Sequence, residues 1–170
     1  MRAKLVGVLV VGLAFGAVSG CSDSESTPTG MFDPCAEISD NAIKSAGFDP
    51  ATKESVQGVT PYSVRCRISS SGRSGSLGLE HPNGVAPPRT YEAYLASAQS
   101  VANSPGGQAP TVTQINGRDA YVGPQSILGC AVHLRTATGV LSISVNYFDA
   151  NNCPSAERVS AILEPSIGDR

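Results

Sequence analysis

The chain has no tryptophan, only two histidines and few charged side chains, which make up 15% of its 170 residues. This charge content is below the roughly 25% of an average soluble domain. Hydrophobic residues make up 41%, which is too many for a chain that stays disordered because it cannot bury enough apolar surface. The formal net charge of −2 and the lack of a basic cluster exclude nucleic acid as an expected partner, because phosphate binding needs a concentrated positive face.

Long hydrophobic runs are also missing, apart from one near the start. Residues 5–18 are apolar except for three glycines, and they follow a short positive segment with Arg2 and Lys4. A helix over this run would be about 21 Å long, which is less than the ~30 Å hydrocarbon core of a bilayer. Residues 1–20 are therefore typical of a secretion signal and not of a helix that spans the membrane.

The signal ends in Val18-Ser19-Gly20-Cys21, which has the form of a bacterial lipobox. The alternative is an ordinary signal peptide that ends near a cysteine by chance. We expect cleavage before Cys21 and lipidation of its thiol, with acyl chains such as palmitate that bury CH₂ groups at about 0.8 kcal/mol each. The protein would then be a lipoprotein anchored at the extracytoplasmic face of the cell membrane.

Residues 22–30, SDSESTPTG, are polar and carry no apolar period. Such a segment is typical of a flexible tether, so residues 21–30 are expected to be the acylated cysteine and its linker. Residues 31–170 are expected to form one domain, because about 140 residues suffice for a single core.

Five cysteines are an odd number for an exported chain, but lipidation of Cys21 leaves Cys35, Cys66, Cys130 and Cys153. They form no Cys-x-x-Cys pair that would favour zinc or a redox site, whereas disulfides suit an oxidising compartment. Spacing alone leaves three connectivities open. Cys35 and Cys153 lie beside prolines at expected helix starts, and Cys66 and Cys130 lie in strand-like runs. This context favours Cys35–Cys66 and Cys130–Cys153.

Periodicity predicts three helices and six strands in the domain. The expected helices begin at Asp33-Pro34, at Thr90 and at Pro154; the first runs to Gly47, with Ser39 or Asp40 able to cap a second turn. The expected strands are residues 62–69, 76–81, 111–115, 118–122, 130–136 and 140–147. Asn116-Gly117 is a strong hairpin signal. The order predicts an α+β fold, an antiparallel sheet of five to six strands with helices packed on it.

No catalytic residue is predicted. The best serine-hydrolase set would combine Ser74 or Ser76 with His81 or His133 and with Asp119 or Asp149. However, Ser74-Gly75-Ser76-Leu77-Gly78 lacks the first glycine of a Gly-x-Ser-x-Gly nucleophile elbow, and no helix follows it. Its glycines are more typical of a tight hairpin. We interpret His133 as a solvent-facing residue of its strand and His81 as a loop residue at a strand end.

Three residues are candidates for an anion-binding patch. Arg65 and Arg67 alternate with apolar residues, so they point outward from one strand, and His133 could share their face of the sheet. The alternative is that carboxylates such as Glu80 neutralise the two arginines.

Two tyrosines are candidates for a protein interface. Tyr91 and Tyr94 lie on the second helix, and tyrosine is enriched at binding surfaces. The alternative is that Tyr91 packs in the core and Tyr94 is ordinarily exposed. No metal site and no cofactor are expected.

Several features occur together in this chain: the lipobox, the tether, the Phe32-Asp33-Pro34-Cys35 helix start, Cys66 within a strand, Cys130 and the closing Cys153-Pro154 helix. This combination resembles the small actinobacterial lipoproteins of the mycobacterial Lpr type, a domain family of unknown function. The resemblance spans nearly the whole mature chain. It implies a secreted envelope lipoprotein with two disulfides and a PsbP-like sandwich, and it transfers no active-site residue.

The function expected from these features is that of a non-catalytic binding module, monomeric and anchored to the membrane by its lipid. Its partner would be an envelope protein or another envelope component. The alternative is a carrier for a lipid or small apolar ligand, which would need an enclosed cavity of about 300–1,000 Å³. A small hydrolase is the remaining class.

Overall fold

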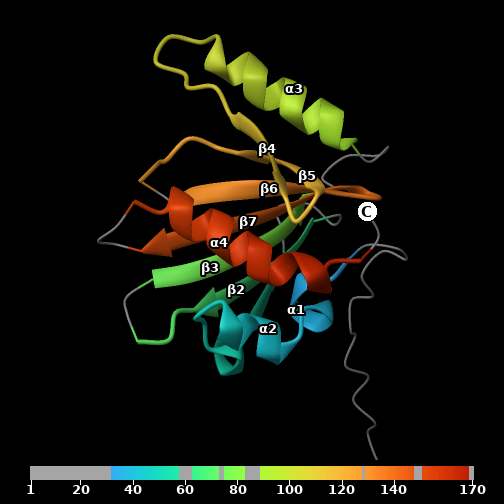
Figure 1. Cartoon of the computed structure of the whole chain (residues 1–170), viewed down its shortest axis with the longest axis vertical. Helices are drawn as coiled ribbons and strands as arrows, with labels where there is room; N and C mark the ends of the chain where they lie inside the picture. The colour runs from blue at the N-terminus through green and yellow to red at the C-terminus, as the bar shows by residue number, and fades with distance from the viewer. Residues whose placement is uncertain are drawn as a thin grey trace, which may run out of the picture.

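The computed structural model describes residues 32–57, 63–72, 75–82, 89–127, 129–147 and 151–168. The described residues form one seven-stranded antiparallel sheet, in the order β1-β2-β3-β7-β6-β5-β4, with four α-helices (Figure 1). The predicted α+β class is therefore confirmed. The predicted signal peptide, Cys21 and the tether lie outside the described residues, so lipidation stays a prediction.

The sheet contains one strand more than predicted. Its strands are β1 Glu54–Gln57, β2 Ser63–Ser69, β3 Gly75–Pro82, β4 Thr111–Ile115, β5 Arg118–Val122, β6 Cys130–Thr136 and β7 Gly139–Tyr147. The additional strand is β1, which has four residues and pairs only with β2 at the edge of the sheet. Four residues are too few for an alternating pattern to stand out in the sequence.

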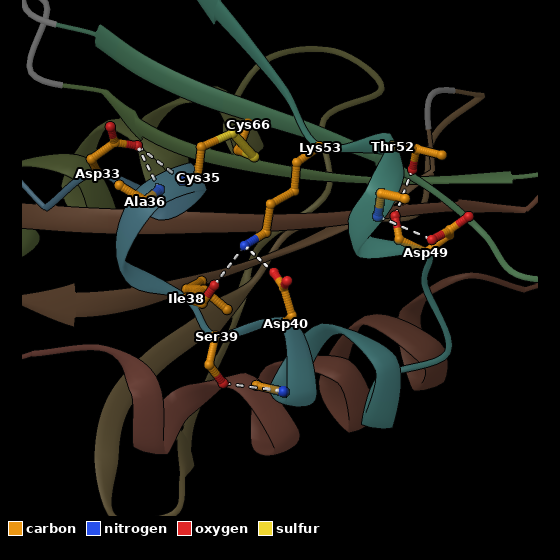
Figure 2. Close-up of polar contacts among 12 residues, drawn as sticks. Asp33, Cys35, Ala36, Ile38, Ser39, Asp40, Asp49, Thr52, Lys53 and Cys66 are labelled. Carbon is orange, nitrogen blue, oxygen red and sulfur yellow. Dashed lines mark hydrogen bonds and ion pairs between the residues drawn. A yellow bond between two sulfur atoms is a disulfide. The ribbon is translucent and has the colours of Figure 1, made fainter.

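The helices are α1 Pro34–Glu37, α2 Asp40–Ser45, α3 Tyr91–Ala102 and α4 Cys153–Leu163, with short 3₁₀ segments η1 Pro50–Thr52 and η2 Glu164–Ser166. The single helix predicted up to Gly47 is wrong, because Ile38 is extended and separates α1 from α2. The carboxylate of Asp33 caps α1, and the hydroxyl of Ser39 caps α2, as predicted for that residue. Lys53 Nζ bridges the break by binding Ile38 O at 2.9 Å and Asp40 Oδ1 at 2.8 Å (Figure 2).

The two faces of the sheet differ: we call the face covered by α1, α2 and α4 the helical face, and the face that carries only α3 among the described helices the open face. Helices α1, α2 and α4 pack with the buried side of the sheet into one core, whose members include Ile43, Ile68, Leu79, Val132, Ile143, Val159 and Leu163. Helix α3 packs on the opposite, open face, where Tyr91 joins Tyr121 and Val140 in a second, smaller cluster. Figure 1 shows α4 crossing the sheet, α1 and α2 at its β2 end, and α3 at its β4 end.

Both predicted disulfides are confirmed. Cys35–Cys66 joins α1 to β2 and Cys130–Cys153 joins β6 to the start of α4, with Cα–Cα distances of 5.1 and 4.9 Å. Each bond therefore ties the beginning of a helix to the sheet that it covers. Their sequence separations of 31 and 23 residues correspond to about 3.5 kcal/mol of stabilisation each in the chain-entropy model.

Candidate functional site: a polar groove on the open face

Helix α3 packs on the Val140 end of β7, and beside it the described part of the open face is hollowed over β2, β3 and residues 144–146 of β7. The hollow has a volume of about 340 Å³ and is lined by Arg65, Arg67, Ser76, Leu77, Gly78, Glu80, Ser144 and Asn146. We call it the polar groove. Its volume lies at the lower end of the range of about 300–1,000 Å³ that is usual for small-molecule sites.

Strand alternation and register bring these side chains together. Arg65 faces Glu80, and Arg67 faces Gly78, which in turn faces Ser144. The floor is low because position 78 has no side chain: a Cβ there would lie 2.5 Å from the hydroxyl of Ser144. That hydroxyl donates to Gly78 O at 3.2 Å. The groove is therefore a consequence of a glycine placed between an arginine and a serine.

The two arginines of the groove are held differently. Arg65 donates from Nε and Nη2 to one oxygen of Glu80, at 3.1 and 2.6 Å, and the other oxygen of Glu80 accepts from Ser63 at 3.1 Å. Arg67 approaches Glu54 only to 3.9 Å, and both side chains are more than half exposed. Exposed ion pairs of this kind contribute little to the free energy of folding. Neutralisation by a carboxylate is thus confirmed for Arg65, whereas Arg67 is only loosely paired.

His133 does not add a positive charge to this face. It lies in the register row that runs from Arg65 through Glu80 and Ser142 to His133 and Tyr121. Its ring stacks on Tyr121 at 4.4 Å, and its Nδ1 lies 2.8 Å from Ser142 Oγ. Burial lowers the pKa of His133 to about 4, so the ring is neutral at pH 7. His133 lies on the polar face of its strand, as interpreted, but it is half-buried and not fully solvent-facing, because its ring stacks on Tyr121.

Ser142 and His133 form a hydroxyl–imidazole contact that was not predicted from the sequence. A hydroxyl within hydrogen-bond distance of an imidazole is the arrangement of an activated nucleophile. However, none of the described residues hydrogen-bonds to Nε2 of His133, so no acid orients the ring. A base with a pKa of about 4 is also poorly matched to neutral pH. The register of β6 and β7 could have been used to find the pair, because it places both residues on the polar face.

The predicted hydrolase residues are dispersed. Ser76 lies in the groove, but His81 is on the opposite face of the same strand because the two residues are an odd number of positions apart. Ser76 faces Asn146 and His133 faces Ser142, so Ser76 and His133 are about 13 Å apart along the strands. Asp119 is ion-paired with Arg135, and Ser74 and Asp149 lie outside the described residues.

The interpretation of His81 as a loop residue is wrong. It is 0% exposed within β3, and its Nε2 lies 3.3 and 3.1 Å from the hydroxyls of Thr136 and Thr138. Burial lowers the pKa of His81. The period-two run of Leu77, Leu79 and His81 was the sequence signal for this burial.

The tyrosines of α3 pack and do not form a free surface. Tyr91 is buried and its ring centroid lies 5.9 Å from that of Tyr121, which confirms the core interpretation. Tyr94 is half-buried, with the guanidinium of Arg89 5.7 Å from its ring centre, so ordinary exposure was wrong for it.

A second hollow of about 400 Å³ lies between the start of α3 and the β6–β7 turn. Its Arg135 is paired with Glu92 and Asp119. Most residues lining this hollow and the polar groove are polar or charged. This lining does not match the enclosed apolar cavity that a lipid carrier would need.

Within the described ranges, no cluster of three or more histidine, cysteine, aspartate or glutamate side chains could hold a metal ion. None of the helices in those ranges is long and apolar enough to cross a bilayer.

No family model, no curated protein and no solved structure matches the chain.

Proposed function

We propose that the protein is a lipid-anchored, non-catalytic binding module of the cell envelope, which holds an envelope component in the polar groove. The observation that carries this proposal is the position of the groove relative to the entry of the chain. Phe32 and Cys35 pack against the core of the helical face, whereas the groove lies on the open face. The described chain therefore enters the domain on the face opposite the groove.

The disulfides and the tether agree with an extracytoplasmic location. Both disulfides link buried or half-buried cysteines of the described domain, and such bonds persist in oxidising compartments. The segment from Cys21 to Phe32 would have a root-mean-square span of about 17–20 Å as a flexible chain. This distance allows the domain to stand clear of the lipid headgroups. The resemblance to Lpr-type lipoproteins points in the same direction.

Site-specific crosslinking in living cells tests the proposal. A photo-crosslinking amino acid replaces Ser76 in the groove of the full chain, and a matched variant carries it at Glu157, an exposed position on α4 of the helical face. We expect a defined adduct from position 76 that is absent from position 157. We also expect Cys21→Ser to remove the adduct, because the unanchored protein leaves the membrane. Identical adducts from both positions, or none from position 76, would overturn the proposal.

A further inference from the structure

The polar groove has a surplus of hydrogen-bond donors. The described residues provide no hydrogen bond to the side chains of Ser76 or Asn146 and no hydrogen bond to the guanidinium of Arg67. Both oxygens of Glu80, in contrast, already accept from Arg65 and Ser63. A ligand that matches these free donors presents acceptor oxygens. Amines and other cations are therefore not the ligand class that the groove favours.

The groove also excludes ligands that are held mainly by apolar contact. Its lining contains no aromatic side chain, and its one large aliphatic residue, Leu77, is 0% exposed. The hydroxyls of Ser76 and Ser144 and the amide of Asn146 each donate and accept. They lie on adjacent strands, where Ser76 faces Asn146 and Ser144 lies one row away. Such a set matches a ring that carries several hydroxyl groups.

The guanidinium of Arg67 favours a ligand ring that carries a carboxylate over a neutral ring. Without an aromatic platform for stacking, affinity has to come from hydrogen bonds, and the strong ones are charge-assisted and bidentate. The guanidinium of Arg67 is only loosely paired, with Glu54 3.9 Å away, and Arg67 stands directly opposite Gly78 at the floor. A carboxylate seated on Arg67 would place the attached ring over Gly78 and Ser144.

Resting on the proposed function, we propose that the polar groove binds an acidic sugar, a ring with several hydroxyls and one carboxylate, as part of an envelope glycan. The carboxylate is held by Arg67 and the hydroxyls by Ser76, Ser144 and Asn146. Arg65 is paired with Glu80 through two contacts, and the two side chains line the groove beside Arg67. The volume of about 340 Å³ is enough for a ring of this kind.

Ligand-observed NMR on the full acylated chain in nanodiscs tests the inference. The probes are D-glucuronic acid, its neutral match D-glucose, and N-acetyl-alanine, which has a carboxylate but no hydroxyl groups. We expect D-glucuronic acid to bind about tenfold more tightly than either of the others, since one bidentate charge-assisted contact and the hydroxyl contacts must act together. Arg67→Gln is expected to abolish the preference over D-glucose.

The matched control is Arg158→Gln, which removes the same charge from an exposed position on α4 and is expected to leave all affinities unchanged. Equal binding of N-acetyl-alanine and D-glucuronic acid would overturn the sugar assignment in favour of a bare carboxylate site. Equal binding of both sugars would overturn the role of Arg67. If no probe binds while position 76 still crosslinks in cells, the ligand class is wrong and the binding module stands. If both experiments fail, the proposed function fails with the inference.

Discussion

Arg118 and Glu164 form an ion pair in which Nε lies 2.8 Å from Oε1 and the side chains are only 3% and 2% exposed. The guanidinium also donates to the carbonyl oxygens of Arg135, Ile167 and Gly168 at 2.9–3.0 Å. One side chain of β5 therefore holds the segment that follows α4 against the edge of the core. Because the pair lies on the helical face, it supports the sheet from the side opposite the groove.

Glu164→Gln is expected to lower the free energy of unfolding by about 3–5 kcal/mol, because it leaves the Arg118 charge buried without its counterion. Urea unfolding of the disulfide-intact protein measures this change. Glu54→Gln is the control, since its pair with Arg67 is exposed and stretched to 3.9 Å, and such pairs contribute at most about 1 kcal/mol. Similar losses for the two variants would show that the buried pair has no special role.

Removal of one disulfide through Cys130→Ala with Cys153→Ala is expected to cost about 3.5 kcal/mol, and removal of Cys35–Cys66 should cost a similar amount. The closed loops differ little in length, 23 against 31 residues, so the two losses should nearly match. Chemical denaturation of both double variants provides the comparison. A loss below about 1 kcal/mol for either bond would contradict the chain-entropy account of that bond.

Most of the fold could be predicted from the sequence because most of its elements follow from local patterns. Alternation identified β2, β6 and β7, and proline and strand context identified both disulfide pairs. The patterns failed where a contact comes from a distant element of the fold. Nothing near Arg118 in the sequence indicates Glu164, and the polarity of His133 suggested exposure although Tyr121 covers its ring. The groove itself depends on the strand order β2-β3-β7, which brings Gly78 beside Ser144.

His133 is expected to make stability depend on pH between about 6.5 and 4. Its folded pKa of about 4 lies below the value of 6.5 for a free histidine, because burial disfavours the charged ring. The unfolded chain therefore binds more protons in this window. The contribution of about 3 kcal/mol is fully present above pH 6.5 and is lost as the pH falls toward 4. His81 acts in the same direction.

The imidazole signals in an NMR titration measure this directly, since the chain has only two histidines. His133→Gln assigns the signals and should flatten the pH dependence of the free energy of unfolding. A titration of His133 near pH 6.5 would show that Tyr121 does not keep the ring out of water.

Gly78 and Ser144 are expected to be energetically coupled. A Cβ at position 78 would lie 2.5 Å from Ser144 Oγ but 3.9 Å from Ser144 Cβ, which is an ordinary contact. Gly78→Ala alone should therefore cost about 1–3 kcal/mol, as overpacking usually does. In the Ser144→Ala background the hydroxyl is gone, and the same substitution should be tolerated.

Urea unfolding of the wild type, both single variants and the double variant gives the coupling free energy, which we expect to exceed about 1 kcal/mol in favour of the double variant. Additive losses would mean that the floor of the groove adjusts and that glycine is not required there. Because Gly78→Ala raises the floor in either background, the double variant, where stability is restored, should also bind D-glucuronic acid more weakly than Ser144→Ala alone does. That comparison separates loss of groove volume from loss of folding.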